Sequence, residues 1–306
     1  MDVLEAQNNR YNGTAAIWFT SHAQIDASDW NNIQEFKGDY HPLVGYYRSD
    51  DPQVLDKQLR WMRRAGVDLI VYDVYGFGRW NLTDLPNDKV LPMLVEALSH
   101  QQNEARKLKL VIWLEKYAAN PSLEQYRYAL DTIRDQFAQK DFYFQYQGKP
   151  LVVTYHNGQN DAIDEIEWEN QFFSLRRIRP YYSDVLAYVD HYPQRLNREW
   201  MPASPGFDAY LEEAYLAKYF RKEHDPDYAS IRQRCHSAGR EDGKFYEKQL
   251  LRARQGDPKI IFISGWNDWQ YANQVEPAVE YRFKYVDMTA RLLGREAETK
   301  TYKNMD

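Results

Sequence analysis

The sequence has 306 residues and a formal net charge of −6, with 43% hydrophobic and 27% charged residues. These values are ordinary for a globular protein and exclude extensive disorder. The acidic balance argues against a nucleic-acid-binding protein, which would carry a basic face or stripe. A (β/α)8 barrel takes about 250 residues as one folding unit, so the length suits a single domain of that kind.

The cysteine content and the first residues bear on the cellular compartment. Cys235 is the single cysteine, so no internal disulfide can form, and no Cys/His spacing typical of a zinc site occurs. No apolar run reaches the length of a transmembrane helix. Residues 1–12 are polar and lack the basic and apolar regions of a signal peptide. Two localisations stay open: the cytoplasm, or export from a bacterium if the sequence begins after a removed signal.

Short runs rich in apolar and β-branched residues alternate with segments of helical period, which is typical of βα units and a parallel sheet. In chain order, the sequence predicts strands over residues 15–20, 68–75, 109–114, 151–155, 172–178, 185–189, 200–203 and 260–264. About eight strands separated by helices predict a parallel barrel.

Two helices have clear boundary signals. The first begins after Asp51-Pro52, an N-cap residue followed by proline, and ends at Gly66. Its apolar stripe consists of Leu55, Leu59 and Met62. Its basic cluster, interpreted as a solvated face, consists of Arg60, Arg63 and Arg64. The second helix is predicted to begin at Asn120-Pro121. Its apolar stripe consists of Leu123, Tyr126, Leu130, Ile133 and Phe137.

The predicted fold class is α/β, a single (β/α)8 TIM barrel with extended βα loops that covers residues 1–306. The polar, irregular stretch at about 212–243 is interpreted as a loop insertion near the active face. A doubly wound sheet is the main rival, and it would usually carry a glycine-rich phosphate turn after its first strand. No such turn follows any predicted strand. The barrel is therefore favoured, and nucleotide binding is not expected.

Polar and aromatic residues gather where the predicted strands end, which is the face that carries barrel active sites. These residues are Asp73, Tyr75, Glu115, Tyr117, His156, Asp190, Trp266, Asn267, Asp268 and Trp269. Glycoside hydrolysis needs two carboxyl groups across the scissile bond, and flat apolar faces hold the sugar ring. Asp73 has a second interpretation, as a buried acid bonded to backbone. Histidine spacing does not support a metal site, and no cofactor is expected.

The segment from Ile263 to Pro277 resembles the last strand end of glycoside hydrolase family 99, the endo-α-mannosidases and endo-α-mannanases, and of related barrels in polysaccharide-biosynthesis proteins. That pattern is W/F-N-E-W-x-E-G-T-x-I-E-P. It is matched here by Trp266, Asn267, Trp269, Glu276 and Pro277. Three further segments resemble the family: His41 to Tyr47, Trp113 to Tyr117 and Met201 to Gly206. The ordered matches extend over more than 200 residues, and they imply a barrel with a sugar site.

The resemblance implies a mechanism that this sequence does not fully carry. In the family, one glutamate is a base that lets the substrate's 2-hydroxyl attack, and a second protonates the leaving oxygen. The matching positions hold Asp268 and Tyr271. Aspartate keeps the carboxylate, but tyrosine, with an ordinary pKa of about 10, is a poor general acid at neutral pH. The family's Gly-Thr pair is Ala272-Asn273 here.

Three functions stay open. The first is an endo-acting glycoside hydrolase for a polysaccharide or oligosaccharide, the substrate being the expected partner. Asp268 would be its base or nucleophile, Glu115 the second carboxylate and Asp73 the reserve acid. Tyr271 would bond the sugar or orient Asp268. The residues expected to stack on or bind the sugar are Tyr46, Tyr75, Tyr117, His156, Asp190, Trp266, Asn267 and Trp269. The second function is a non-catalytic carbohydrate-binding relative, and the third is a polysaccharide-biosynthesis barrel associated with a glycosyltransferase. The oligomeric state is left open.

Overall fold

The computed structural model describes residues 13–18, 40–77, 89–116, 121–155, 165–166, 170–178, 200–206, 239–269 and 272–304. Its strands are β1 (Gly13–Trp18), β2 (Leu69–Phe77), β3 (Lys109–Lys116), β4 (Gln145–Tyr146), β5 (Lys149–Tyr155), β6 (Ser174–Ile178), β7 (Trp200–Ala203) and β8 (Ile260–Ile263). Its helices are α4 (Pro52–Ala65), α5 (Val90–Ser99), α6 (Leu123–Gln136), α10 (Lys244–Gln255), α11 (Lys284–Leu292) and α12 (Glu296–Thr299), with the 3₁₀ turns η3 (Glu241–Gly243) and η5 (Lys300–Asn304). No helix in this part of the chain is long and apolar enough to cross a membrane.

The strands form one curled sheet whose order follows the chain. The order is β7–β8–β1–β2–β3–β5, with β6 on the far side of β5, and all these pairs are parallel. The short β4 pairs antiparallel with β5. First and last strands are neighbours, with Ala15 of β1 opposite Phe262 of β8. This pairing is typical of a barrel, because a doubly wound sheet reverses its order at a switch point.

Most of the predicted strands are confirmed within one or two residues at each end. The expected strand at 185–189 lies outside the described residues, as do residues 207–238, which contain most of the expected insertion. The described strands leave one interruption in the sequential order, between β6 and β7. That interruption spans residues 179–199.

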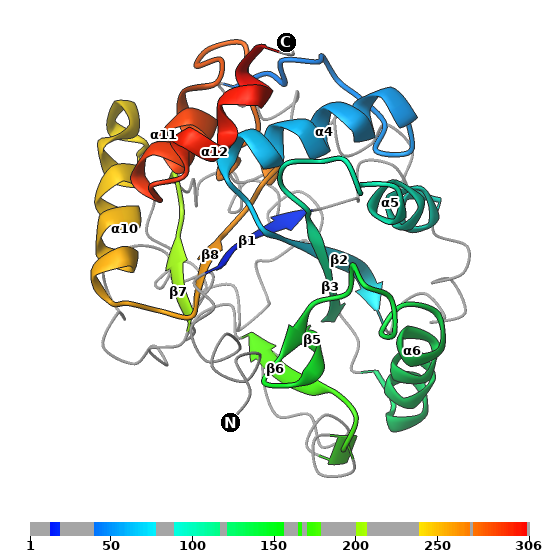
Figure 1. Cartoon of the computed structure of the whole chain (residues 1–306). Coiled ribbons are helices and arrows are strands. Elements are labelled where there is room, and N and C mark those ends of the chain that lie inside the picture. Colours follow the sequence, from blue (N-terminus) through cyan, green and yellow to red (C-terminus); the bar gives the residue numbers. More distant parts are fainter. Residues whose placement is uncertain are drawn as a thin grey trace, which may run out of the picture.

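The sheet packs an apolar layer on each face, as the alternation of side chains along a strand requires. Along β2, Leu69 and Val71 belong to an inner cluster that includes Trp113 of β3. Ile70 and Tyr72 belong to the larger cluster that lies between the sheet and the helices. Helices α4, α5, α6, α10 and α11 cover the outside of the curled sheet (Figure 1). Because both faces of the sheet are apolar, polar functional groups are expected at the ends of the strands.

Helix α4 confirms the boundary signals in the sequence. The Asp51 side chain accepts a hydrogen bond from the Gln53 backbone at 2.8 Å, with proline in the first turn. Gly66 ends the helix with φ +78°, a conformation in which a side chain would be strained. A Cβ there would also lie 2.9 Å from the Arg295 Cβ. After this C-cap the chain continues into β2, which begins at Leu69.

Helix α6 begins later than predicted. Its N-cap is Ser122, so the helix starts at Leu123 and not at Asn120-Pro121. The Ser122 hydroxyl accepts from the Gln125 backbone at 3.2 Å, and the Gln125 side chain accepts from the Ser122 backbone at 2.8 Å. This reciprocal pair satisfies two otherwise unbonded backbone donors, which explains the later start. The predicted stripe is confirmed at its centre, where Tyr126 and Ile133 are buried.

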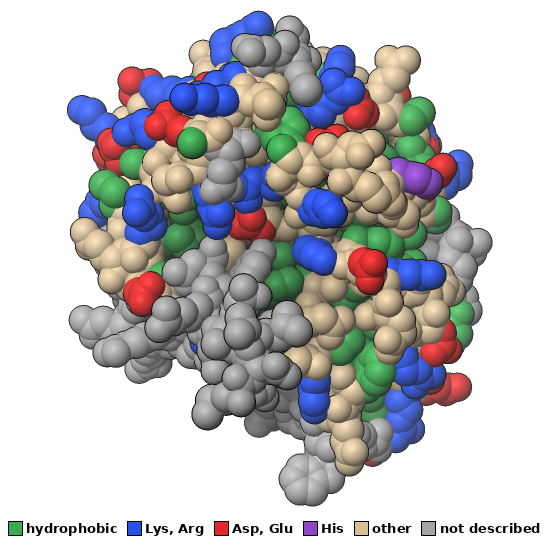
Figure 2. Space-filling view, in the orientation of Figure 1, with side chains coloured by type: hydrophobic (Ala, Val, Ile, Leu, Met, Phe, Trp, Pro, Cys, Tyr) green, Lys and Arg blue, Asp and Glu red, His purple; other side chains and the backbone are tan. Residues whose placement is uncertain are grey.

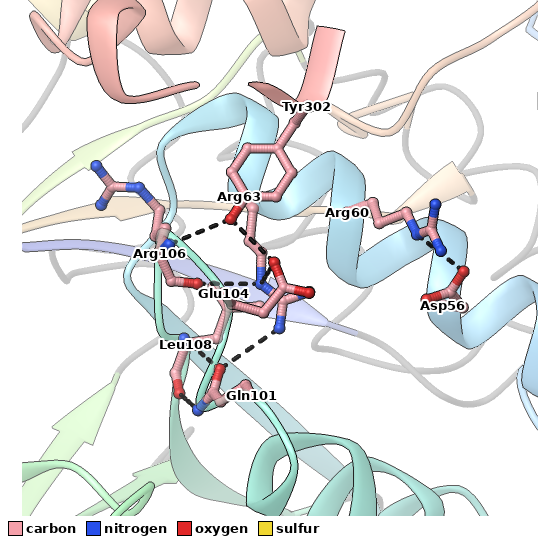
Figure 3. Close-up of polar contacts among 8 residues, drawn as sticks. All are labelled: Asp56, Arg60, Arg63, Gln101, Glu104, Arg106, Leu108 and Tyr302. Atoms are coloured by element: carbon pink, nitrogen blue, oxygen red, sulfur yellow. Dashed lines mark hydrogen bonds and ion pairs between the residues drawn. The ribbon is translucent and has the colours of Figure 1, made fainter. Parts of the chain in front are cut away.

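The interpretation of the α4 arginines as a solvated face is wrong for two of them. Arg63 and Arg64 are only 4% and 7% exposed, whereas Arg60 stays near the surface and pairs with Asp56. Arg63 donates to the Arg106 carbonyl at 3.1 Å and lies 3.7 Å from the Glu104 carboxylate (Figure 3). Burial is tolerated because acceptors from the β2–β3 connection surround the guanidinium.

Candidate active site

The loop after β8 folds back tightly on itself at the C-terminal end of the strand. Gly265 has φ +86°, and a Cβ there would lie 2.8 Å from both the Asn273 carbonyl oxygen and the Asp268 Cβ. Only glycine permits this approach. The Val275 backbone closes the loop by donating to the Gly265 and Trp266 carbonyls at 3.1 and 3.0 Å. These contacts place Asp268 in a closed loop directly after β8.

Asp268 is 9% exposed, and Asn273 fixes it from two directions. The Asn273 side-chain amide donates to the Asp268 Oδ2 at 3.2 Å, and the Asn273 backbone donates to the Asp268 carbonyl at 3.1 Å. The same amide donates to the Ser264 hydroxyl at 3.2 Å and accepts from the Ser204 hydroxyl at 2.7 Å. Both protons of the Asn273 amide are therefore engaged, which orients the amide nitrogen toward Asp268 and Ser264.

Asp73 is a fully buried carboxylate on β2. It lies opposite Trp113 of β3 and in phase with Val71, which belongs to the inner cluster. The carboxylate therefore belongs to the inner face of the sheet, at the middle of β2. The backbone of Glu115 continues β3 two residues beyond Trp113, and its side chain lies outside the described residues.

A third buried carboxylate, Glu276, accepts hydrogen bonds from three side chains packed against the loop. Tyr47 and Trp269 donate to its Oε2 at 2.8 Å each, and the Gln58 amide donates to its Oε1. Burial raises the pKa of Glu276 to about 7, although the three hydrogen bonds oppose the shift. Asn267 joins this network by donating to the Tyr47 hydroxyl at 3.3 Å. The carboxylate is fully buried and engaged at both oxygens, so it supports the loop and does not face a substrate.

The tryptophans of the motif lie in the supporting layer. Trp266 is 0% exposed and donates to the Gln58 Oε1 at 2.5 Å, and Trp269 is 2% exposed. A wall that stacks on a sugar needs an open ring face, so this burial does not support the predicted stacking role of either residue. Asn267 is likewise 0% exposed. Tyr46, by contrast, is 44% exposed, with its ring 6.2 Å from that of His41.

The remaining predicted residues lie wholly or in part outside the described residues. Tyr117, His156, Asp190 and Tyr271 lie outside the described residues, and of Tyr75 only the backbone is described. Among the residues that are described, no three His, Cys, Asp or Glu side chains converge to hold a metal ion.

Sequence reasoning missed the residues that support Asp268. Glu276 matches the family motif, but the sequence assigned it no role. Tyr47 directly follows Tyr46, a predicted sugar-binding residue. Gln58 gave no clear signal, because isolated amides are common on helices, and Asn273 stood out only as the residue in place of the family's threonine. The supporting layer became recognisable only when α4 and the β8 loop were placed together.

One cavity, of about 360 Å³, lies at the opposite end of the sheet. Its wall includes Thr14 at the start of β1 and the side chains of Arg254 and Arg295. Barrel chemistry takes place at the other end, where the strands finish. The cavity therefore lies away from the end of the sheet where catalysis is expected.

On the face of the molecule that Figure 2 shows, Lys and Arg side chains are interspersed with Asp and Glu side chains.

The curled parallel sheet is of the barrel type, and comparison with known proteins gives the family. The model of glycosyl hydrolase family 99 matches residues 12–177, more than half of the chain. The chain belongs to glycosyl hydrolase family 99, which confirms the resemblance drawn from the motifs.

The chain is similar to curated relatives at low identity. It is 19% identical to a glycoprotein endo-alpha-1,2-mannosidase of Xenopus laevis over 300 residues, which cover 84% of this chain and 63% of the relative. It is 22% identical to a glycoprotein endo-alpha-1,2-mannosidase-like protein of Mus musculus, over 78% of this chain and 58% of that relative. The chain thus spans about three fifths of the length of these relatives.

Solved structures share the fold. A GH99 endo-alpha-mannosidase from Bacteroides thetaiotaomicron, in complex with bis-tris-propane, superposes with a TM-score of 0.60 at 16% identity, covering 95% of this chain and 99% of that one. A structure described as a glycoside hydrolase-like protein gives a TM-score of 0.55 at 11% identity, over 93% and 94% of the two chains. At such identities the likeness establishes the fold alone.

Proposed function

We propose that the chain is an endo-acting glycoside hydrolase that cleaves α-mannosidic bonds in an oligosaccharide or polysaccharide. Family membership and the names of the relatives support the reaction class and the sugar. The observation that carries the proposal is Asp268, a carboxylate held by Asn273 on the loop after β8. In this proposal the barrel is a closed (β/α)8 barrel, with residues 185–189 filling the interruption between β6 and β7.

In this proposal, Asp268 is the base or nucleophile. Glu115 is its partner, since position 115 follows Trp113 in phase along β3, and Asp73 is the reserve acid. A glycosidase needs two carboxyl groups, whose separation sets retention or inversion. Glu276 has a pKa suited to a general acid, but its complete burial and three donors rule it out as the group that meets the substrate.

Among the predicted sugar-binding aromatics whose side chains are described, Tyr46 is the proposed stacking surface, because it alone of them is exposed, at 44%. Tyr75, Tyr117, His156 and Asp190 keep their proposed sugar-binding roles on sequence grounds. Tyr271 is proposed to bond the sugar or to orient Asp268.

The second candidate function is a carbohydrate-binding relative without turnover. It is motivated by Tyr271, which stands where the family has its acid. A hydroxyl with an ordinary pKa of about 10 donates a proton poorly to a leaving oxygen at neutral pH.

Digestion of a glycan panel tests the proposal. Wild-type protein is incubated with α-mannan, α-1,2-linked mannooligosaccharides, α-glucans and β-glucans, and the products are read by mass spectrometry. Internal cleavage of an α-mannoside that disappears in Glu115→Gln supports the proposed enzyme and its carboxylate pair. Binding of an α-mannoside without cleavage at any pH supports the binding relative instead. Neither binding nor cleavage of any glycan contradicts both functions.

A further inference from the structure

The loop that carries Asp268 is clamped by an arginine outside the family motif. Arg240, located just before η3, is 6% exposed. Its Nη2 donates to the carbonyl oxygens of Ala272 and Gln274 at 2.9 and 2.8 Å. These two carbonyls flank Asn273 in the sequence. A single side chain thus holds the backbone on both sides of the residue that bonds Asp268.

The guanidinium of Arg240 lies in a box of aromatic rings. Its Cζ is 4.8 Å from the ring centre of Tyr40, 5.1 Å from that of Tyr281 and 4.5 Å from that of Tyr285. Tyr281 and Tyr285 pack edge to face at 4.7 Å. Among the described residues, the Nε and Nη1 of Arg240 have no hydrogen-bond acceptor. The rings and the two carbonyl oxygens together compensate for the buried positive charge.

The turn at residues 272–274 has a backbone conformation that its amino acids do not favour. Ala272 has φ +51°, in the left-handed region that residues with a Cβ adopt at a cost. A charge-assisted hydrogen bond to the Ala272 carbonyl opposes relaxation of this conformation. Loss of the bond is expected to release the turn, and the Asn273 side chain would then move relative to Asp268.

We propose that Arg240 is a positioning residue for Asp268, acting through the 272–274 turn and the hydrogen bond from Asn273. This rests on the proposed function, in which Asp268 carries the reaction. Arg240 does not meet the substrate. It sets the geometry of a carboxylate that must keep one orientation.

The test compares Arg240→Met with Arg63→Met, which removes an equally buried arginine from the opposite end of the molecule. On a glycan that the wild type cleaves, Arg240→Met is expected to lower kcat about 10- to 100-fold with little change in KM, because small misplacements of reacting groups have effects of that size. Arg63→Met is expected to keep the wild-type kcat at temperatures where it is folded. Arg240→Lys retains the charge but not the planar fork, so it should give an intermediate kcat.

Two further measurements separate positioning from general stability. Guanidinium, added to Arg240→Ala below its unfolding range, should restore part of kcat by refilling the tyrosine box. Carbodiimide labelling, mapped by mass spectrometry, needs no turnover: Asp268 should be modified faster in Arg240→Met than in the wild type or Arg63→Met. If Arg240→Met does not fold, Arg240→Lys takes its place in both comparisons.

The outcomes are distinguishable. Wild-type kcat in folded Arg240→Met, or an Asp268 labelling rate equal to that of the wild type, overturns the positioning role. If the wild type cleaves no glycan, the proposed function fails by itself, and the labelling comparison still decides whether Arg240 controls Asp268.

Discussion

Glu276 shows how a single residue couples the site to the solution pH. Three donors from three segments favour its charged form, yet burial dominates and the pKa rises to about 7 from an ordinary value of 4.5. The folded state therefore binds this proton more tightly than the unfolded chain does. The resulting stabilisation is fully present below pH 4.5 and is lost as the pH rises through 7.

We predict that Glu276→Gln removes this pH dependence. Between pH 5 and pH 8, the free energy of unfolding of the wild type should fall by about 2–3 kcal/mol more than that of the variant, given the two pKa values. Urea unfolding at the two pH values measures the difference. Glu247→Gln, which changes a partly exposed acid on α10, should follow the wild-type profile. Parallel profiles for wild type and Glu276→Gln would contradict the assignment.

At the scale of elements, the turn after Trp269 holds a strained backbone. Ala272 occupies φ +51°, and the family has glycine at the matching position. Glycine adopts this region without steric conflict with a Cβ. The departure from the family pattern is therefore a source of local strain next to Asp268.

We predict that Ala272→Gly stabilises the protein by about 0.5–1 kcal/mol, because it removes the left-handed strain. Ala253→Gly, in the interior of α10, should destabilise it by at least about 1 kcal/mol, since glycine lowers helix propensity and the buried methyl is lost. Denaturant midpoints of the two variants measure both effects. Destabilisation by both substitutions would show that the Ala272 conformation is not strained.

Sequence reasoning located most elements because the signals were local. The Asp51 cap and Gly66 stop of α4 each act within one turn, and β-rich runs lie between helical periods. The α6 start was misplaced because two capping signals, Asn120-Pro121 and Ser122 with Gln125, compete within three residues. The pattern alone does not rank them.

Tertiary contacts decided the features that the sequence did not reveal. An aromatic at a strand end can stack on a sugar or fill the core, and only the positions of Gln58 and Glu276 show that Trp266 and Trp269 do the latter. Arginines on an amphipathic helix usually face solvent. The acceptors that bury Arg63 come from a different part of the chain and could not be inferred from helical spacing.

At the scale of the whole molecule, the two ends of the sheet have different tasks. Near the starts of β2 and β3, Arg106 pairs with Asp68 and its backbone donates to the Tyr302 hydroxyl at 3.1 Å. Tyr302 also donates to Glu104 at 3.0 Å, which attaches the C-terminal turn to this end (Figure 3). Polar networks at the strand starts of a barrel maintain stability, whereas strand ends carry chemistry.

We therefore predict that Arg63→Met lowers the free energy of unfolding by about 2–3 kcal/mol, because it leaves buried acceptors without their donor. Arg60→Met, on the same helix, should change it by no more than about 0.5 kcal/mol, as expected for an exposed ion pair. Urea unfolding compares the variants. Equal changes in the free energy of unfolding would contradict the buried role of Arg63 and support the interpretation that Arg60 and Arg63 are both solvated.

The central claim is that this member of family 99 cleaves glycosidic bonds with the carboxylate of Asp268. It is tested most directly by the kcat of Asp268→Asn on the glycan that the wild type cleaves best. Asp257→Asn, at the opposite end of the sheet, is the matched control. We predict a loss of about 10²- to 10⁴-fold in Asp268→Asn, typical of removing a general base, and no loss in the control. A folded Asp268→Asn variant with wild-type kcat would contradict the account.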